Sequence, residues 1–171
     1  MDKKYFVVKN YLTDDECDDY LTLCRVLDPN PTLEVGLKKE SNKNKHVAVN
    51  RTYWTIRSMT KHMRPLKALA EEKFGLEPDS LRFKFGRFAH IMCYDTPGQG
   101  LEWHAEPNIS KVSVSINLSD EWEYVGADFE MKMAPNLDLK KGDAILYSGS
   151  AMHRVSDLIG GRKFSFVMWL A

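Results

Sequence analysis

The first residues that could do chemistry are a histidine and a glutamate two positions apart, His104 and Glu106. In an extended segment, residues i and i+2 point to the same face, so the imidazole and the carboxylate would be presented side by side. A second imidazole, His153, follows the apolar run AILY at residues 144–147. We expect a facing strand of a β-sandwich to bring His153 to the His104 and Glu106 pair.

Two imidazoles and one carboxylate on one face form the facial triad of non-heme Fe(II) oxygenases, which leaves coordination positions open. Zinc competes for the same ligands, but it usually takes them from a helical HExxH motif, which the sequence lacks. The pattern therefore favours iron. We expect two other histidines to be structural or solvated and not functional, because His46 lies in a Lys-rich segment and His62 falls on the polar side of a predicted helix.

The last apolar segment, residues 163–170, adds a cation to this set. In a strand, Lys163 and Ser165 share one face, whereas Phe164, Phe166 and Met168 share the other. A buried ammonium needs an anionic partner, so this face could clamp a small dicarboxylate. The alternative is an edge-strand lysine that only prevents aggregation.

These side chains need a β-rich scaffold, and the second half of the chain supplies one. Short β-branched or aromatic segments, separated by Gly, Pro, Asn or Asp, predict strands at 81–85, 87–94, 111–118, 127–133, 143–147 and 163–170. Helices come first and strands follow. This order predicts an α+β, mainly β, fold: a two-layer β-sandwich or barrel flanked by helices.

The first 80 residues are expected to provide helical support and a lid. Residues 5–8 predict a strand, and Thr13 with Glu16 forms a capping box that opens a helix. The apolar stripe of this helix is Cys17, Tyr20, Leu21, Cys24 and Leu27. A second stripe, which Gly75 ends and Pro65 kinks or restarts, is Met59, Met63, Leu66, Ala70 and Phe74. Residues 36–46, GLKKESNKNKH, predict a solvated loop or a mobile lid.

Composition limits the classes of protein that the chain could be. With 171 residues, we expect one domain over 1–171, with the β-rich core at 81–171. Lys and Arg total 24 and Asp and Glu total 24, which argues against nucleic acid and anionic lipid as partners. The three cysteines share no CxxC spacing and are expected to be reduced core thiols. Because neither a signal peptide nor a membrane-length apolar stretch is evident, the sequence predicts a cytoplasmic protein with no membrane partner.

Taken in order, six segments resemble the 2-oxoglutarate and Fe(II)-dependent dioxygenases of the prolyl 4-hydroxylase type, including the bacterial PKHD-type hydroxylases. The segments are VVKNYLTDDECDDYL, YDTPGQGLEWHAE, KVSVSINLSDEW, VGADFEM, LKKGDAILYSGSAMHRV and RKFSFVMWL. The resemblance covers nearly the whole chain and is densest from Tyr94 to Trp169. It implies a double-stranded β-helix, a jelly roll of eight core strands with helices braced against one sheet.

The resemblance also implies roles for individual residues. His104, Glu106 and His153 match the iron ligands, although Glu106 stands where the family usually has aspartate. Lys163 matches the residue that pairs with the distal carboxylate of 2-oxoglutarate, and we prefer it to its neighbour Arg162. Ser165 and Tyr94 match cosubstrate contacts, and Arg51 matches a substrate-side arginine or forms a surface ion pair. The paired glycines of the family are Gly126-Ala127 here, a change that should tolerate the added β-carbon.

The implied reaction couples decarboxylation of 2-oxoglutarate to hydroxylation of a C–H bond, with Fe(II), dioxygen and ascorbate as a reductant. The expected substrate is a prolyl or other residue of a peptide or protein, over which residues 36–50 would close. Free amino acids remain an alternative. So do an oxygenase acting on alkylated nucleic acid bases, which the zero net charge disfavours, and a non-catalytic jelly-roll binding module.

Overall fold

The computed structural model describes residues 4–29, 52–56, 60–86 and 88–171. Its main layer is a six-stranded antiparallel sheet in the order β1-β8-β5-β11-β3-β2. These strands are β1 (Tyr5–Val8), β8 (Ala144–Ser148), β5 (Val112–Asn117), β11 (Lys163–Leu170), β3 (Ala89–Tyr94) and β2 (Thr52–Ile56). The strands of this large sheet therefore come from both ends of the chain.

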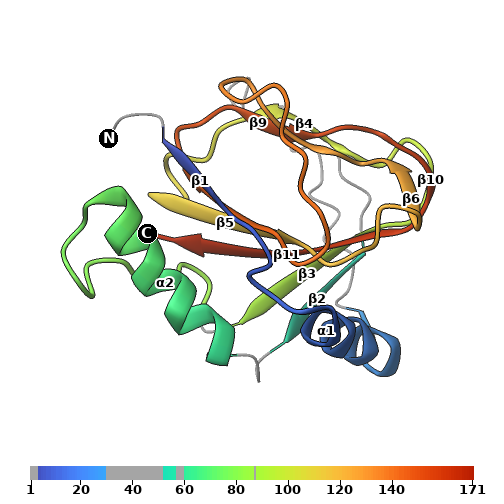
Figure 1. Ribbon diagram of the computed structural model, residues 1–171, viewed down its shortest axis with the longest axis horizontal. Helices are drawn as coiled ribbons and strands as arrows, with labels where there is room; N and C mark the ends of the chain where they lie inside the picture. Colours follow the sequence, from blue (N-terminus) through green and yellow to red (C-terminus); the bar gives the residue numbers. More distant parts are fainter. Residues whose placement is uncertain (1–3, 30–51, 57–59, 87) are drawn as a thin grey trace, which may run out of the picture.

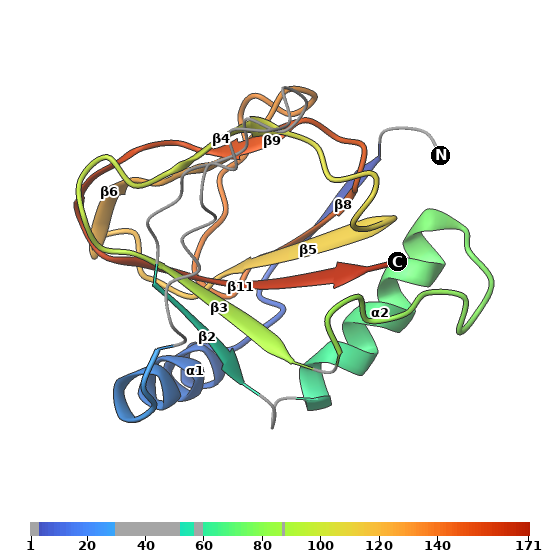
Figure 2. The same ribbon diagram turned by 180° about the vertical axis from the view of Figure 1, so that it is seen from behind.

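A smaller β layer faces the large sheet (Figure 1). It contains a three-stranded sheet, β4-β9-β7, and a two-stranded sheet, β10-β6. The bounds are β4 (Leu101–His104), β9 (His153–Val155), β7 (Phe129–Met131), β10 (Leu158–Gly161) and β6 (Tyr124–Gly126). The helices α1 (Asp14–Val26) and α2 (Thr60–Phe74) cover the opposite face of the large sheet, as Figure 2 shows from behind. The predicted jelly-roll sandwich with helices braced against one sheet is confirmed.

Strict alternation along β5 gives the two faces of the large sheet opposite characters. Val112, Val114 and Ile116 belong to the apolar core under the helices, while the intervening residues Ser113 and Ser115 are buried on the other side. The strand is buried along its whole length. The polar face therefore points into the space between the two β layers, where buried hydroxyls need partners.

The predicted helices form, with two wrong details. Leu27, predicted for the apolar stripe of the first helix, is the C-cap residue after α1 and is exposed. The capping box at Thr13 and Glu16 is present, and Gly75 follows α2 with φ +65°. His62, however, is buried and not on a polar helix side, so that expectation is wrong. Its ring nitrogens lie 2.9 Å from the Tyr20 hydroxyl and 3.1 Å from Glu16 Oε1, because the start of α2 packs against α1.

The strand prediction is correct for six segments and wrong for one. β1 and β11 have the predicted bounds, whereas the ends of β3, β5, β7 and β8 are shifted by one or two residues. Residues 81–85 are not a strand, because the chain makes one bridge, Phe83 to Leu170, and then turns. The strands that prediction missed are β2, β4, β6, β9 and β10.

Other expectations concern cysteines, membranes and the Lys-rich segment. All three cysteines are buried and free, as predicted. None of the helices in the described ranges is long and apolar enough to span a membrane. Met59, the segment 36–50 with His46, and Arg51 lie outside the described residues.

Candidate metal centre and adjoining cavity

His104 and His153 lie on neighbouring strands of the small layer. The two residues are direct partners in the pairing of β4 with β9, and their ring centroids are 4.2 Å apart. The expectation that His153 reaches the pair from a facing sheet is therefore wrong. Strand pairing within one sheet holds the two imidazoles together.

A backbone carbonyl sets the tautomer of each imidazole. His104 Nδ1 lies 2.7 Å from the carbonyl of Glu102, and His153 Nδ1 lies 2.9 Å from the carbonyl of Ala151. A carbonyl only accepts, so each Nδ1 carries a proton. Burial and the nearby His104 lower the pKa of His153 to about 4, so its ring is neutral at pH 7. The carbonyls leave Nε2 as the nitrogen through which each ring could bind a metal.

The Glu106 side chain reaches the two imidazoles from the turn that follows β4. Its N–H donates to the carbonyl of Gly149 at 2.6 Å, and a β-carbon on Gly149 would stand 1.9 Å from the carbonyl oxygen of Ser110. Only glycine permits this close approach. Glu106 Oε1 lies 3.6 Å from His104 Nε2. Burial opposes ionisation of the carboxyl, but His104, His153 and the Trp169 indole outweigh it and lower the pKa of Glu106.

One ligand atom from each of the three residues fits within a single small volume. These atoms all lie within 4.8 Å of one another, and the group is largely buried. Two imidazole nitrogens and one carboxylate suit a first-row divalent metal such as Fe(II). The residues present therefore fit the metal that the sequence predicts.

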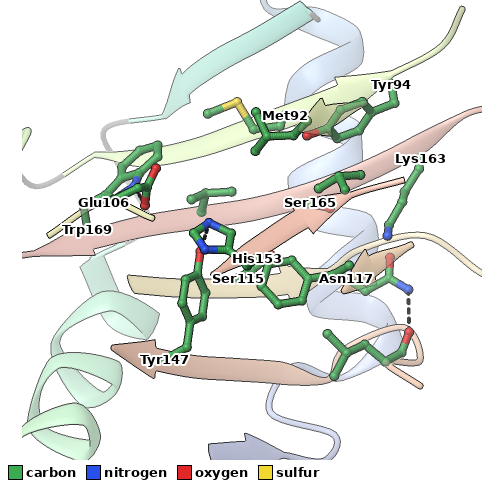
Figure 3. A pocket seen from close by; sticks show the side chains of 15 residues that line it. Met92, Tyr94, Glu106, Ser115, Asn117, Tyr147, His153, Lys163, Ser165 and Trp169 are labelled. Carbon is green, nitrogen blue, oxygen red and sulfur yellow. Dashed lines mark hydrogen bonds between the residues drawn. The ribbon is translucent and has the colours of Figure 1, made fainter. Parts of the chain in front are cut away.

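A cavity between the two β layers starts at this cluster. Figure 3 shows Glu106 and Trp169 at one end, Lys163 at the other, and His153 and Ser165 between them. The lining residues are Met92, Tyr94, Leu101, Glu106, Ser115, Asn117, Phe129, Leu139, Tyr147, His153, Val155, Lys163, Ser165, Val167 and Trp169. The structure thus brings the predicted residues Tyr94, Lys163 and Ser165 into one cavity with Glu106 and His153 of the metal cluster.

Lys163 is a buried cation without a carboxylate partner. Its side chain donates to the carbonyl of Ala127 at 2.5 Å and lies 5.0 Å from the Tyr124 ring centroid. Within the described part of the chain, no carboxylate comes within 4.0 Å of its Nζ. Burial lowers the pKa of Lys163 to about 8, and the charge of Asp128 only partly opposes this. A bound anion would balance the buried charge of the Lys163 ammonium.

The neighbouring positions agree with the predicted faces of the last strand. Arg162 is exposed, with its guanidinium 6.0 Å from the Phe164 ring centroid, so it points away from the cavity. Ala127 is fully buried with φ +50°, so the chain accommodates the β-carbon where the family has glycine. Gly126 could not be replaced in the same way, since a β-carbon there would stand 2.2 Å from the carbonyl oxygen of Asp157.

Sequence reasoning missed several polar residues around the cluster. Tyr147 places its hydroxyl 3.4 Å from His153 Nε2, and Ser113 and Trp169 both donate to Glu106 Oε2. Period-two alternation could have found Trp169, because it lies on the same face of the last strand as Lys163 and Ser165. No local pattern marks Tyr147, whose strand reads as a purely apolar run.

Solved structures share this fold at low sequence identity. A viral collagen prolyl hydroxylase from Paramecium Bursaria Chlorella virus-1, in complex with 2-oxoglutarate (2OG), matches with a TM-score of 0.69 and 14% identity over 99% of this chain and 96% of that chain. A Pseudomonas putida prolyl-4-hydroxylase matches with a TM-score of 0.70 and 16% identity over 99% and 92%. A Trichoplax adhaerens prolyl hydroxylase, in complex with a hypoxia inducible factor peptide fragment, matches with a TM-score of 0.60 and 14% identity over 97% and 82%.

These likenesses define the class of fold. No protein-family model matches the sequence, and no curated protein matches it. The structural matches include several prolyl hydroxylases and a member of the 2OG-Fe(II) oxygenase family from Burkholderia pseudomallei. The chain therefore has the fold of the 2OG-Fe(II) oxygenases, as the resemblance in its sequence implies.

Proposed function

We propose that the chain is an Fe(II)- and 2OG-dependent dioxygenase that hydroxylates a C–H bond. One observation carries the proposal: Glu106 and His153, which form a possible metal site with His104, line the same cavity as the buried Lys163 cation. A metal alone would not need the lysine. A dicarboxylate that binds the metal at one end and a cation at the other uses both.

The residues have distinct roles in this proposal. His104, Glu106 and His153 hold Fe(II), which when bound supplies the oxygen chemistry of the reaction. Lys163 binds the distal carboxylate of 2OG, and Ser165 and Tyr94 line the same cavity, with Tyr94 paired directly beside Lys163. The apolar walls, such as Phe129 and Val155, exclude water from the reacting atoms.

The substrate that we propose is a prolyl or other residue of a peptide or protein. Its support is the likeness to prolyl hydroxylases, one of which was solved with a peptide fragment. The zero net charge disfavours a nucleic acid substrate. The roles of Arg51, of the segment 36–50 and of ascorbate, and the extent of the domain, stay predictions.

Oxidation of 2OG in the absence of substrate tests the activity. Protein loaded with Fe(II) under anaerobic conditions is mixed with 2OG, oxygen is admitted, and succinate is measured. We expect succinate from the wild type and from Arg162→Ala, whose side chain points away from the cavity, but not from His153→Ala. Succinate no higher than that from free Fe(II) would contradict the proposal.

The same assay identifies the substrate class. Proline-containing peptides are added, and a gain of one oxygen atom is sought by mass spectrometry together with faster succinate formation. Free proline and methylated oligonucleotides serve as competing substrates. Suppose that free proline is hydroxylated, or that the oligonucleotide loses its methyl group, while no peptide gains oxygen. The peptide assignment is then wrong, but the oxygenase assignment stands.

A further inference from the structure

Two hydrogen-bond donors contact one oxygen of the Glu106 carboxylate. The indole N–H of Trp169 donates to Glu106 Oε2 at 3.0 Å, and the Ser113 hydroxyl donates to the same oxygen at 3.3 Å. The other oxygen, Oε1, lies toward His104. The two oxygens of one carboxylate are therefore in different environments.

The surroundings of Trp169 and Ser113 fix both donors in place. The Trp169 ring is edge-on to Phe85 and to His90, each with ring centroids 5.3 Å away. Ser113 is fully buried, and its hydroxyl lies 2.6 Å from that of Ser110. If Ser113 donates to Glu106, Ser110 must supply the proton that Ser113 accepts. The hydroxyls then form a chain that ends on the carboxylate, which strengthens each bond.

The length of the glutamate side chain matters for this contact. Aspartate on the same backbone would withdraw the carboxylate by about 1.5 Å, the length of one C–C bond. It could not then reach both the histidine nitrogens and Trp169. The indole is a donor only, so it would be left without an acceptor in a partly buried place.

We propose that Trp169, with help from Ser113, is a positioning residue that makes Glu106 a one-oxygen metal ligand, and that the glutamate is matched to this tryptophan. The inference rests on the proposed metal site and adds a residue outside the ligand set. Trp169 and Ser113 together would use both lone pairs of Oε2, so that Oε1 would be the oxygen that binds the ion. One coordination position that a two-oxygen carboxylate would fill would then stay open for 2OG and dioxygen.

Metal titrations of variants test the inference without any turnover. Mn(II) affinity is measured by calorimetry, and the visible absorption of bound Co(II) reports the coordination number. We expect Trp169→Phe to weaken Mn(II) binding by about tenfold to a hundredfold, the range for partners that orient a metal ligand. Its Co(II) spectrum should change because Oε2 becomes free to bind. Trp122→Phe is the matched control, since Trp122 is 80% exposed, and should bind as the wild type does.

A double-mutant cycle tests the match between glutamate and tryptophan. In the wild type, Glu106→Asp should weaken Mn(II) binding by about the same factor as Trp169→Phe. In the Trp169→Phe background it should weaken binding much less, because both changes remove the same contact between Trp169 and Glu106. Ser113→Ala, which leaves the Trp169 packing intact, should weaken binding by a smaller factor. Ser113→Ala therefore tests the positioning of Glu106 even if Trp169→Phe fails to fold.

The outcomes separate this inference from the proposed function. Wild-type protein that binds no Mn(II) would overturn the metal site, and this inference with it. Wild-type binding that Trp169→Phe and Ser113→Ala leave unchanged would overturn the positioning role alone. Fully additive effects of Glu106→Asp and Trp169→Phe would show that the glutamate is not matched to the tryptophan.

Discussion

The two faces of the large sheet differ in what their buried residues do. On the helix side, alternate residues of β5 and β11, such as Val114 and Phe166, pack into an apolar core with α1 and α2. On the cavity side, the alternating positions carry Ser113, Lys163 and Ser165, which are just as deeply buried. One strand sequence therefore serves both stability and chemistry.

The contrast shows which buried polar groups point to a ligand. Ser113 is satisfied inside the protein, because it bonds to Ser110 and Glu106. Lys163 contacts one carbonyl and one ring, but within the described residues no carboxylate lies within 4.0 Å of its Nζ. Burying a charge without a partner is costly. A bound anion would therefore account for the buried ammonium of Lys163 on the cavity face.

The largest effect on stability should come from the helix face. Phe166→Ala removes a fully buried ring that packs edge-on against Tyr20, and should lower the free energy of unfolding by about 3–5 kcal/mol. Urea denaturation measures this value. Mn(II) affinity at a temperature where the variant is folded should stay within about a factor of three, since the metal cluster lies on the other side of the sheet. Loss of metal binding by the folded variant would break the comparison.

On the cavity side, removal of a ligand should abolish binding and spare the fold. His153→Ala should weaken Mn(II) binding by more than about a hundredfold, beyond the range for residues that only orient ligands. Far-UV circular dichroism and the melting temperature of the metal-free protein should change little. A folded variant that binds Mn(II) like the wild type would remove His153 from the proposed ligand set.

The two faces also explain how far prediction from the sequence could go. The last strand could be predicted with its bounds and both faces, because eight residues show a clear period of two. Strands such as β9, with three residues, are too short to show any period. His62 was misplaced because a helical pattern does not reveal that Glu16 and Tyr20 of another helix pack on it.

The site shows the same limit. His104, Glu106 and His153 could be found because their residue types and order carry the signal. The contact of Trp169 with Glu106 joins residues 63 positions apart. Such a contact depends on the pairing of β11 in the large sheet and on the turn after β4, neither of which has a local signature.

Substitution of Lys163, on the cavity face, should have an effect of intermediate size on ligand binding. Lys163→Met should weaken 2OG binding to the Mn(II)-loaded protein by about tenfold to a few hundredfold, as expected for a hydrogen bond to a charged group worth about 1.5–3 kcal/mol. Calorimetry under anaerobic conditions measures the affinity. Arg162→Ala is the matched control and should have little effect. The reverse pattern would mean that the faces of the strand are assigned wrongly.

The smallest predicted effect is a pH dependence. In the free protein the ammonium of Lys163 loses its proton above the lowered pKa of about 8, whereas a bound carboxylate favours the protonated form. Binding of 2OG above pH 8 must therefore take up a proton, and the affinity should fall by about tenfold per pH unit. The charge of Asp128 acts on Lys163 and slightly favours its ammonium form. Burial raises the pKa of the neighbouring Tyr124 above its ordinary value of 10, so the phenol stays neutral at pH 8 to 9. In Lys163→Met the dependence should vanish, and an unchanged slope in that variant would assign the titration to another group.

Coupling between metal and 2OG binding tests the central claim most directly, because the claim is that one cavity holds both. Calorimetric titration of 2OG into the protein is carried out with and without saturating Mn(II), for the wild type and for His153→Ala. We predict that Mn(II) raises the 2OG affinity of the wild type by at least about tenfold, a coupling of 1.4 kcal/mol or more, and has no effect on His153→Ala. Equal 2OG affinity with and without Mn(II) in the wild type, or no binding in either case, would contradict the account.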